Sequence, residues 1–156
     1  GLDVRTTRRD VAPLAAMRAA KERDSIAREY VTDFEITFTI GAPTLERYMR
    51  ESGDPEASTI QTYLTLLSKI PDSLIARKCG ERTARTISGQ AAAVLRAGGA
   101  FGRQGRRRLA RWDATLRGEG NRLNPGTTAD LTAAALFLVM LEEGVEFMLG
   151  KAHTSF

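Results

Sequence analysis

The sequence predicts an all-α protein, a multi-helix bundle packed around a buried C-terminal helix. Apolar residues recur at helical spacing along most of the chain, as Ile60, Tyr63, Leu64 and Leu67 show. Only residues 33–40 alternate between apolar and polar side chains as a strand does, and an isolated strand without a partner is not stable. The 156 residues are enough for one domain with a sizeable core, so residues 1–156 are expected to form a single helical domain.

The expected helices follow from their apolar stripes and from the residues that start and stop them. Asp10 can serve as the N-cap of the first helix. Pro71 ends one stripe, because the residue before a proline is pushed out of the α region. Gly80 ends the expected helix 74–79, and the Gly98-Gly99 pair ends the expected helix 81–97, since glycine suits the backbone that follows a helix C-terminus. The expected helices span residues 10–30, 44–50, 56–70, 74–79, 81–97, 106–117 and 131–149.

Residues 33–40 are ambiguous, because they fit both a strand and a helix. Apolar and polar residues alternate there, as in a half-buried strand. Tyr30, Phe34 and Phe38 also step by four, which continues one helical stripe, and we favour the helix. The Gly-Ala-Pro sequence at residues 41–43 is expected to break the chain after it.

Residues 124–131 form a polar helix start in front of the most apolar run of the chain. The Asn-Pro-Gly turn is expected to present free backbone N–H groups, the hydroxyls of Thr127 and Thr128, and the carboxylate of Asp130. Such a helix start suits an anion or a metal–phosphate complex. The alternative is an ordinary capping box with Thr127 as N-cap. The helix behind it, 131–149, is apolar nearly all round and is therefore expected to be buried.

Two further segments carry candidate ligands for a phosphate or a metal. Asp72 could hold a metal while Arg77 and Lys78 hold phosphates, because these groups together can neutralise a polyphosphate–Mg²⁺ complex. The alternative is an N-cap at Asp72, followed by two solvated basic residues near a helix C-terminus. Arg23 lies beside an apolar stripe and could reach the same site, or it could belong to a solvated face of ion pairs.

Composition narrows the possible partners. The net charge of +4 suits a phosphate-bearing partner, because guanidinium groups match phosphate oxygens. The basic run at residues 103–111 has few aromatic neighbours, so nucleic acid is not the favoured partner. The single cysteine, Cys79, excludes an internal disulfide and fits a reducing cytoplasm. The apolar runs are too short to span a membrane, so a cytoplasmic location without membrane contact is expected.

Several segments together resemble the triphosphoribosyl-dephospho-CoA synthase family. These segments are residues 72–80, Gly98-Gly99 and residues 124–138, and residues 23–27 resemble a further family element. The Pro-Gly-x-x-Ala-Asp-Leu order at the start of the last helix is the most specific part. The sequence is most similar to the branch found in archaea and some C1-metabolising bacteria. It resembles the C-terminal half of the full family pattern, so a longer family chain is expected.

The resemblance implies an all-helical enzyme that transfers the triphosphoribosyl group of ATP to dephospho-CoA or a related acceptor and releases adenine. Mg²⁺ would accompany ATP. Asp130 would be a carboxylate inside the core. The resemblance and the residue pattern give Asp72 and Asp130 as catalytic and metal-binding residues, and Arg77, Lys78, Asn124, Thr127, Thr128 and Arg23 as substrate-binding residues.

Departures from the family pattern leave the acceptor and the completeness of the site open. The bacterial branch has a serine and a second glycine in its Pro-Gly turn, and a His-Arg-Gly-Gly run where this chain has Arg77-Lys78-Cys79-Gly80. The family's N-terminal acidic and glycine-rich motifs are also missing, so the site is expected to need an N-terminal half or a second copy of the chain. The competing hypothesis is a non-catalytic helical interaction or dimerisation module, with a basic RNA-binding module less favoured.

Overall fold

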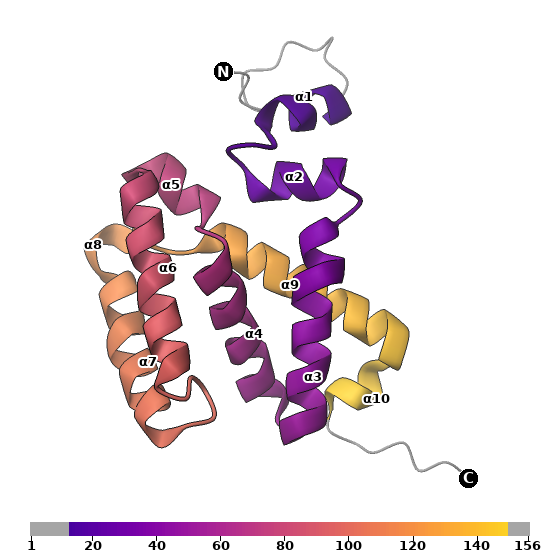
Figure 1. The fold of residues 1–156 in the computed structure, drawn as a ribbon, viewed down its shortest axis with the longest axis vertical. Helices are drawn as coiled ribbons and strands as arrows, with labels where there is room; N and C mark the ends of the chain where they lie inside the picture. The colour runs from indigo at the N-terminus through magenta and orange to yellow at the C-terminus, as the bar shows by residue number, and fades with distance from the viewer. Residues whose placement is uncertain (1–12, 150–156) are drawn as a thin grey trace.

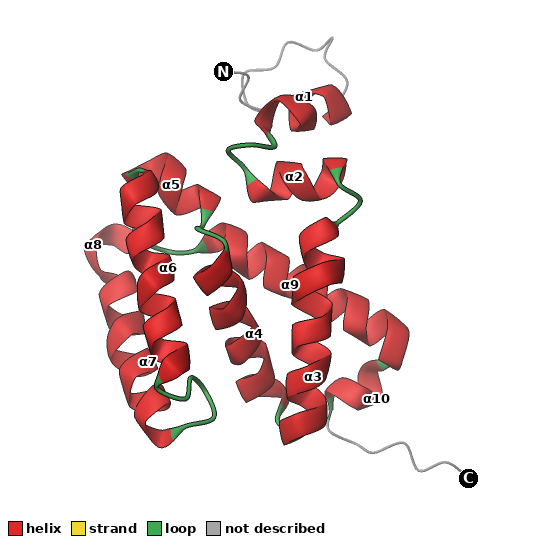
Figure 2. Ribbon diagram, viewed as in Figure 1, coloured by secondary structure: helices red, strands yellow, loops and turns green. Residues whose placement is uncertain are grey.

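A computed structural model describes residues 13–149, and every regular element in that range is helical (Figures 1 and 2). The predicted all-α class is confirmed. No helix in the described range is both long and apolar enough to cross a membrane. The elements are α1 (Pro13–Ala20), α2 (Ser25–Val31), the π-helix η1 (Thr37–Gly41), α3 (Ala42–Ser52), α4 (Pro55–Lys69), α5 (Ser73–Cys79), α6 (Glu81–Arg96), α7 (Arg103–Leu116), α8 (Gly118–Asn121), α9 (Gly126–Glu143) and α10 (Val145–Met148).

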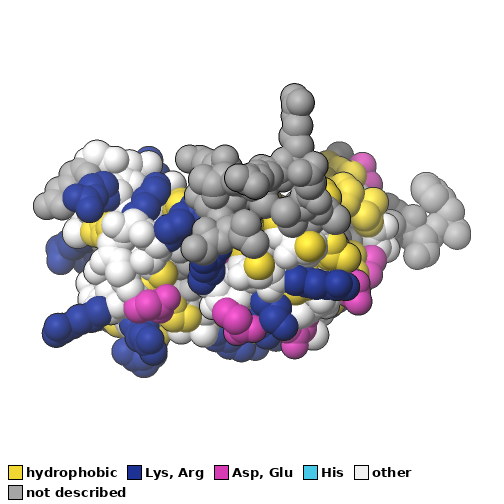
Figure 3. Space-filling model, turned by 90° about the horizontal axis from the view of Figure 1, so that it is seen from above, with side chains coloured by type: hydrophobic (Ala, Val, Ile, Leu, Met, Phe, Trp, Pro, Cys, Tyr) yellow, Lys and Arg dark blue, Asp and Glu magenta, His cyan; other side chains and the backbone are white. Residues whose placement is uncertain are grey.

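Helix α4 is the central element of the arrangement. It packs against α3 on one side and α6 on the other, and it also contacts α9, which passes behind α3 in the view of Figure 1. Helices α6 and α7 form a hairpin at one end of the molecule, and α1 and α2 lie above α3 and α9. The space-filling view shows basic side chains projecting from the α5–α7 end and apolar side chains gathered towards the opposite end (Figure 3).

Leucines of α4 supply the core on two sides. Leu64 and Leu67 belong to an apolar cluster with residues of α5, α6 and α7. Leu66 belongs to a second cluster with Ile36 and with Leu131 of α9. All three leucines are almost completely buried, and a buried leucine side chain contributes roughly 1.5–3 kcal/mol to stability. These clusters hold the start of α9 beside the end of α4, where the candidate site lies.

The helix expected over residues 10–30 is two helices, because the chain turns at residues 21–24. The carboxylate of Asp24 accepts hydrogen bonds from the backbone N–H groups of Ile26 and Ala27, so α2 has its own N-cap. The predicted N-cap Asp10 lies outside the described residues.

The helix favoured over the strand at residues 33–40 is confirmed from Glu35 onward, but the break expected at residues 41–43 is wrong. The chain stays helical through η1 into α3, and the N–H of Ala42 bonds to the carbonyl of Thr37. This wider turn shifts the hydrogen-bond ladder just where Pro43 provides no N–H. The buried carboxylate of Glu29 accepts hydrogen bonds from the N–H groups of Ile36 and Thr37, which helps to satisfy the helix start.

Helix α9 begins earlier and ends earlier than the predicted range of 131–149. It ends at Gly144, whose φ of 83° favours glycine, and α10 follows as a separate short helix. The expectation that it is buried all round is wrong. Val139 on its inner face is fully buried, whereas Phe137 and Leu141 on the outer face are each 65% exposed. An all-apolar helix does not reveal which of its faces has a partner.

The packing of α7 predicts a difference between two glycine variants. A Cβ atom at Gly105 would lie 2.2 Å from the carbonyl oxygen of Gly99, so Gly105→Ala should lower the free energy of unfolding by about 1–3 kcal/mol. The control is Gly89→Ala on the exposed face of α6, where nothing lies within 4 Å of the added atom. That variant should be stabilised by up to about 1 kcal/mol. Urea unfolding followed by circular dichroism measures both, and equal effects would contradict this packing.

Candidate functional site

The centre of the candidate site is the carboxylate of Asp72, which is 1% exposed in the turn between α4 and α5. Its Oδ1 atom accepts hydrogen bonds from the N–H groups of Leu74 and Ile75, at 2.9 and 3.1 Å, and so caps α5. Its Oδ2 atom accepts from the N–H and the hydroxyl of Thr128, both at 2.8 Å. One carboxylate therefore joins the N-termini of α5 and α9.

A row of hydroxyl groups extends this junction to α2. The hydroxyl groups of Ser73 and Thr127 form a hydrogen bond at 3.0 Å, and the N–H of Ser25 donates to the Ser73 oxygen at 3.2 Å. The N-terminal turns of α2, α5 and α9 therefore meet in one place. Local sequence explains the start of α5, because Asp72 follows Pro71, which ends the preceding helix.

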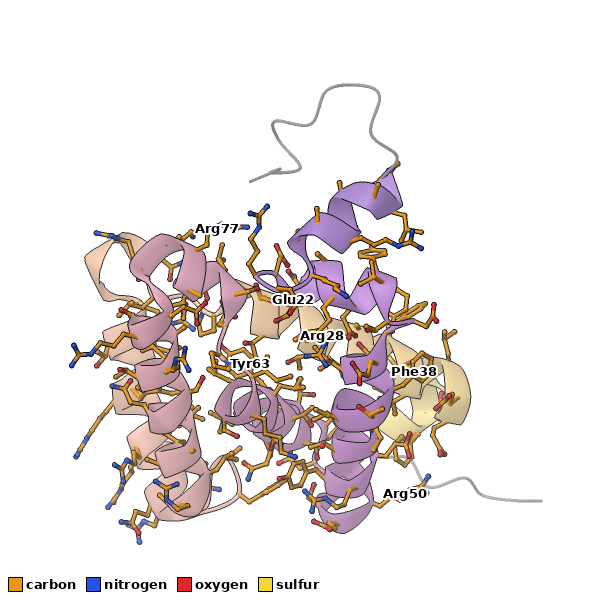
Figure 4. The ribbon with its side chains drawn as sticks, turned by 45° about the horizontal axis from the view of Figure 1, so that its top comes forward. Glu22, Arg28, Phe38, Arg50, Tyr63 and Arg77 are labelled. Atoms are coloured by element: carbon orange, nitrogen blue, oxygen red, sulfur yellow. The ribbon has the colours of Figure 1, made fainter. Side chains whose placement is uncertain are left out.

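A crevice of about 530 Å³ opens between α2 and α5, beside this junction. Arg77 reaches across it from α5 towards the segment between α1 and α2, and Glu22 and Arg28 lie on the facing side (Figure 4). The guanidinium of Arg77 lies 3.6 Å from the Asp24 carboxylate, and Arg28 pairs with Glu35 at 2.8 Å. The crevice thus holds guanidinium groups that carboxylates already neutralise in part. Residues lining it include Lys21, Arg23, Asp24, Ser25, Arg28 and Ser73.

A larger groove of about 1010 Å³ lies between α4, α7 and α9. Tyr63 of α4 and Asn124, just before α9, both line it. Burial raises the pKa of the Tyr63 phenol well above its usual range, and the negative charges of Asp72 and Asp113 raise it further. The phenol therefore stays protonated at neutral pH and can donate a hydrogen bond into the groove.

The structure gathers five of the predicted site residues and separates the other three. Asp72, Thr127 and Thr128 form the junction, and Arg23 and Arg77 flank the crevice beside it. Lys78, Asn124 and Asp130 do not belong to this group. Lys78 is exposed in the last turn of α5, Asn124 lines the groove, and Asp130 is exposed near the start of α9.

Asp130 does not lie inside the core, contrary to the expectation from the sequence. The first turns of α9 direct Thr127, Thr128 and Leu131 inward, and this helical phase leaves Asp130 on the outer face. The capping box that was the alternative for this segment is absent from α9 as well. Pro125 occupies the N-cap position, and the Thr127 hydroxyl is paired with Ser73 instead.

A magnesium ion held jointly by Asp72 and Asp130 does not fit this geometry. Both oxygens of Asp72 already accept protein hydrogen bonds in a buried position, and Asp130 is exposed. Within residues 13–149, no group of three or more His, Cys, Asp or Glu side chains could hold a metal ion. Magnesium that accompanies ATP stays a prediction.

The structure adds Tyr63, Ser25 and Ser73 to the residues that matter. Tyr63 belongs to the ordinary apolar stripe of α4, and the sequence gives no signal that its phenol faces a groove. Ser25 and Ser73 each follow a capping aspartate, Asp24 and Asp72. That repeated Asp-Ser pair at two helix starts is the signal that could have identified them.

Fold and site define an all-α protein in which the N-termini of three helices converge beside a crevice that contains paired charges. The family model described as ATP:dephospho-CoA triphosphoribosyl transferase matches residues 2–147, which is most of the chain. The chain therefore belongs to the CitG family of triphosphoribosyl transferases.

Curated relatives carry matching names. A probable 2-(5''-triphosphoribosyl)-3'-dephosphocoenzyme-A synthase of Pseudomonas fluorescens strain Pf-5 is 32% identical over 111 residues, which is 71% of this chain and 38% of the relative. Proteins of the same name from Pseudomonas paraeruginosa and Azotobacter vinelandii are 37% and 33% identical over 99 and 102 residues, which cover 63% and 65% of this chain and 33% and 34% of those proteins. The matched part thus spans less than two fifths of each relative. No solved structure matches the chain significantly.

The junction predicts that two capping aspartates respond differently to the same substitution. Asp72→Asn should lower the free energy of unfolding by about 2–3 kcal/mol, because an amide N–H₂ would face the two Thr128 donors or the two α5 donors. Asp54 caps α4 through the N–H of Ala57 alone, and Asp54→Asn should change stability by less than about 0.5 kcal/mol, since asparagine caps equally well. Chemical unfolding of both variants is the measurement. Comparable losses would contradict the special position of Asp72.

The raised pKa of Tyr63 predicts a specific loss of stability at alkaline pH. The native state keeps the phenol proton where the unfolded chain, with an ordinary pKa of about 10, releases it. The contribution of the protonated Tyr63 to the free energy of unfolding is therefore complete below about pH 10, and it is lost as the pH rises above that value. Tyr63→Phe should flatten the decline of unfolding free energy above about pH 10, whereas Tyr30→Phe, at an exposed position, should not. Parallel pH profiles for the parent and Tyr63→Phe would contradict the burial.

Proposed function

We propose that the chain takes part in transferring the triphosphoribosyl group of ATP to dephospho-CoA or a related acceptor, with release of adenine. The family match over residues 2–147 is the observation that carries this proposal. The names of the curated relatives support it, since each describes a synthase of the triphosphoribosyl derivative of dephospho-CoA.

The reaction sets clear demands on a site. It breaks the bond between adenine and the anomeric carbon of ribose, and the acceptor hydroxyl oxygen forms the new bond to that carbon. The hydroxyl proton is released and the adenine ring takes up a proton as it leaves. The transition state resembles the cationic one of glycoside cleavage. The enzyme must therefore hold three phosphates, place a carboxylate near the acceptor hydroxyl and limit the access of water.

We propose that the phosphates of ATP bind in the crevice. Arg23 and Arg77 flank it, and Lys78 lies in the last turn of the same helix as Arg77. A phosphate group that binds Arg77 must compete with Asp24, whose carboxylate lies 3.6 Å from the guanidinium. Release of Asp24 would therefore accompany binding, and the exposed position of Arg77 leaves it room to move.

Asp72 has a positioning role in this proposal, because its oxygens are occupied by hydrogen bonds to α5 and α9. It fixes the turn that presents Thr127 and Thr128. Asp130 is our candidate for the carboxylate near the acceptor, since it is exposed beside that turn. Asn124 would contact substrate from the groove side, where it lies at the other end of the same turn.

The whole site is proposed to need more of the family sequence than this chain matches. The matched part spans 38% of the Pseudomonas fluorescens relative, and the crevice contains about as many carboxylates as cationic groups. Further cationic groups and a cover over Asp130 would come from an N-terminal half or from a second copy of the chain. We also propose a cytoplasmic location and magnesium bound to the phosphates of ATP.

A pair of arginine variants tests the proposed phosphate contact. Arg77→Ala should weaken ATP·Mg²⁺ binding, measured by calorimetry, by about tenfold or more, because a charged hydrogen bond contributes about 1.5–3 kcal/mol. The control is Arg107→Ala, an exposed position on α7 away from the crevice, which should bind like the parent.

Two results would contradict the proposal at different levels. Equal affinity of Arg77→Ala and the parent would exclude Arg77 as a phosphate contact. Absence of adenine, measured by chromatography after ATP·Mg²⁺ and dephospho-CoA are incubated with the chain together with the remaining part of the family sequence, would exclude the transfer reaction.

A further inference from the structure

The outer side of α9 carries an apolar seam, which is exposed except at the half-buried Leu136. Ala129, Ala133, Leu136 and Met140 follow one another at spacings of four, three and four residues. This is the heptad spacing with which one α-helix packs along another. Phe137 lies beside the seam and is 65% exposed. Within residues 13–149, most of this aromatic side chain is left uncovered.

The seam forms one wall of the groove between α4, α7 and α9. Ala129, Ala133 and Leu136 line the groove, and so do two further alanines, Ala57 of α4 and Ala110 of α7. Small side chains on several walls let the backbone of another helix approach closely. The groove volume of about 1010 Å³ is enough for about two turns of an α-helix with its side chains, and far more than a few water molecules need.

The groove is edged by charges that would limit which helix can enter. Arg106 and Arg117 of the α7 side, together with Asp54 and Glu56 of the α4 side, are among its lining residues. An apolar centre with a charged edge is the usual anatomy of a protein–protein contact. An amphipathic helix that carries charges of both signs outside its apolar stripe complements this surface.

The length of the relatives indicates where such a helix comes from. The matched part takes in only 38% of the Pseudomonas fluorescens relative, so most of that protein lies outside it. The seam is not a membrane-spanning segment, because no helix in the described range is long and apolar enough to cross a bilayer. A partner helix from the same family sequence would bury Phe137 and Leu141, which are otherwise the most exposed large apolar side chains of α9.

We propose that the α9 seam and the groove dock an amphipathic helix from the part of the family sequence outside the matched region. The inference rests on the proposed function in one respect: the site is proposed to need both the matched region and the rest of the family sequence. The docked helix covers the outer face of α9, and it brings the other part of the family sequence beside Asp130.

A binding experiment without nucleotide tests the proposal. The probe is the part of the Pseudomonas fluorescens relative that lies outside the match, prepared as a separate polypeptide and titrated into the 156-residue chain by calorimetry. The parent should bind it, and the double variant Phe137→Lys with Leu141→Lys should bind at least a hundredfold more weakly. Ala133→Trp, which fills the groove from an exposed position, should weaken binding as well.

The matched control is Tyr30→Lys, which changes an aromatic side chain 53% exposed on α2 and should bind like the parent. Equal binding by the parent, the double variant and Ala133→Trp would overturn the proposal, and so would failure of the parent to bind. Self-association of the parent that the same two lysines abolish would also overturn it, by making a second copy the occupant. Because no ATP is present, these results are independent of whether adenine is released.

Discussion

The carboxylate of Asp72 is the interaction on which the rest of the candidate site depends. It accepts four hydrogen bonds, two from the start of α5 and two from Thr128 at the start of α9. A buried carboxylate is costly unless its acceptor positions are satisfied, so the two helix starts and the carboxylate stabilise one another. The Ser73–Thr127 hydrogen bond and the crevice beside it follow from this geometry.

Helix α9 separates two surfaces with different chemistry. Its inner side holds Thr127 and Thr128 against the Asp72 junction, next to a crevice of paired charges. Its outer side carries Asp130 and an apolar seam that faces a groove. The polar start and the apolar body of this one helix therefore bring the proposed phosphate contact and the proposed docking surface close together, since anything that packs on the seam lies beside the same first turn.

The sequence predicted the local features well and the choice of face poorly. Pro71, the Asp72 cap and Gly80 are read from short-range chemistry, and all three act in the structure as helix-ending or helix-capping residues. Whether Asp130 or Thr128 points inward depends on the phase of α9, which α4 and α5 set through long-range contacts. The exposed side of α9 was missed for a related reason, because an all-apolar helix does not reveal which face lacks a partner.

The most direct test is a double-mutant cycle between Asp72 and Thr128. Unfolding free energies are measured for Asp72→Asn, Thr128→Ala and the double variant, and the cycle isolates the energy that couples the two side chains. If one carboxylate joins α5 to α9 as described, the coupling should be about 1 kcal/mol or more. Additive effects of the two substitutions would contradict the junction and the site built on it.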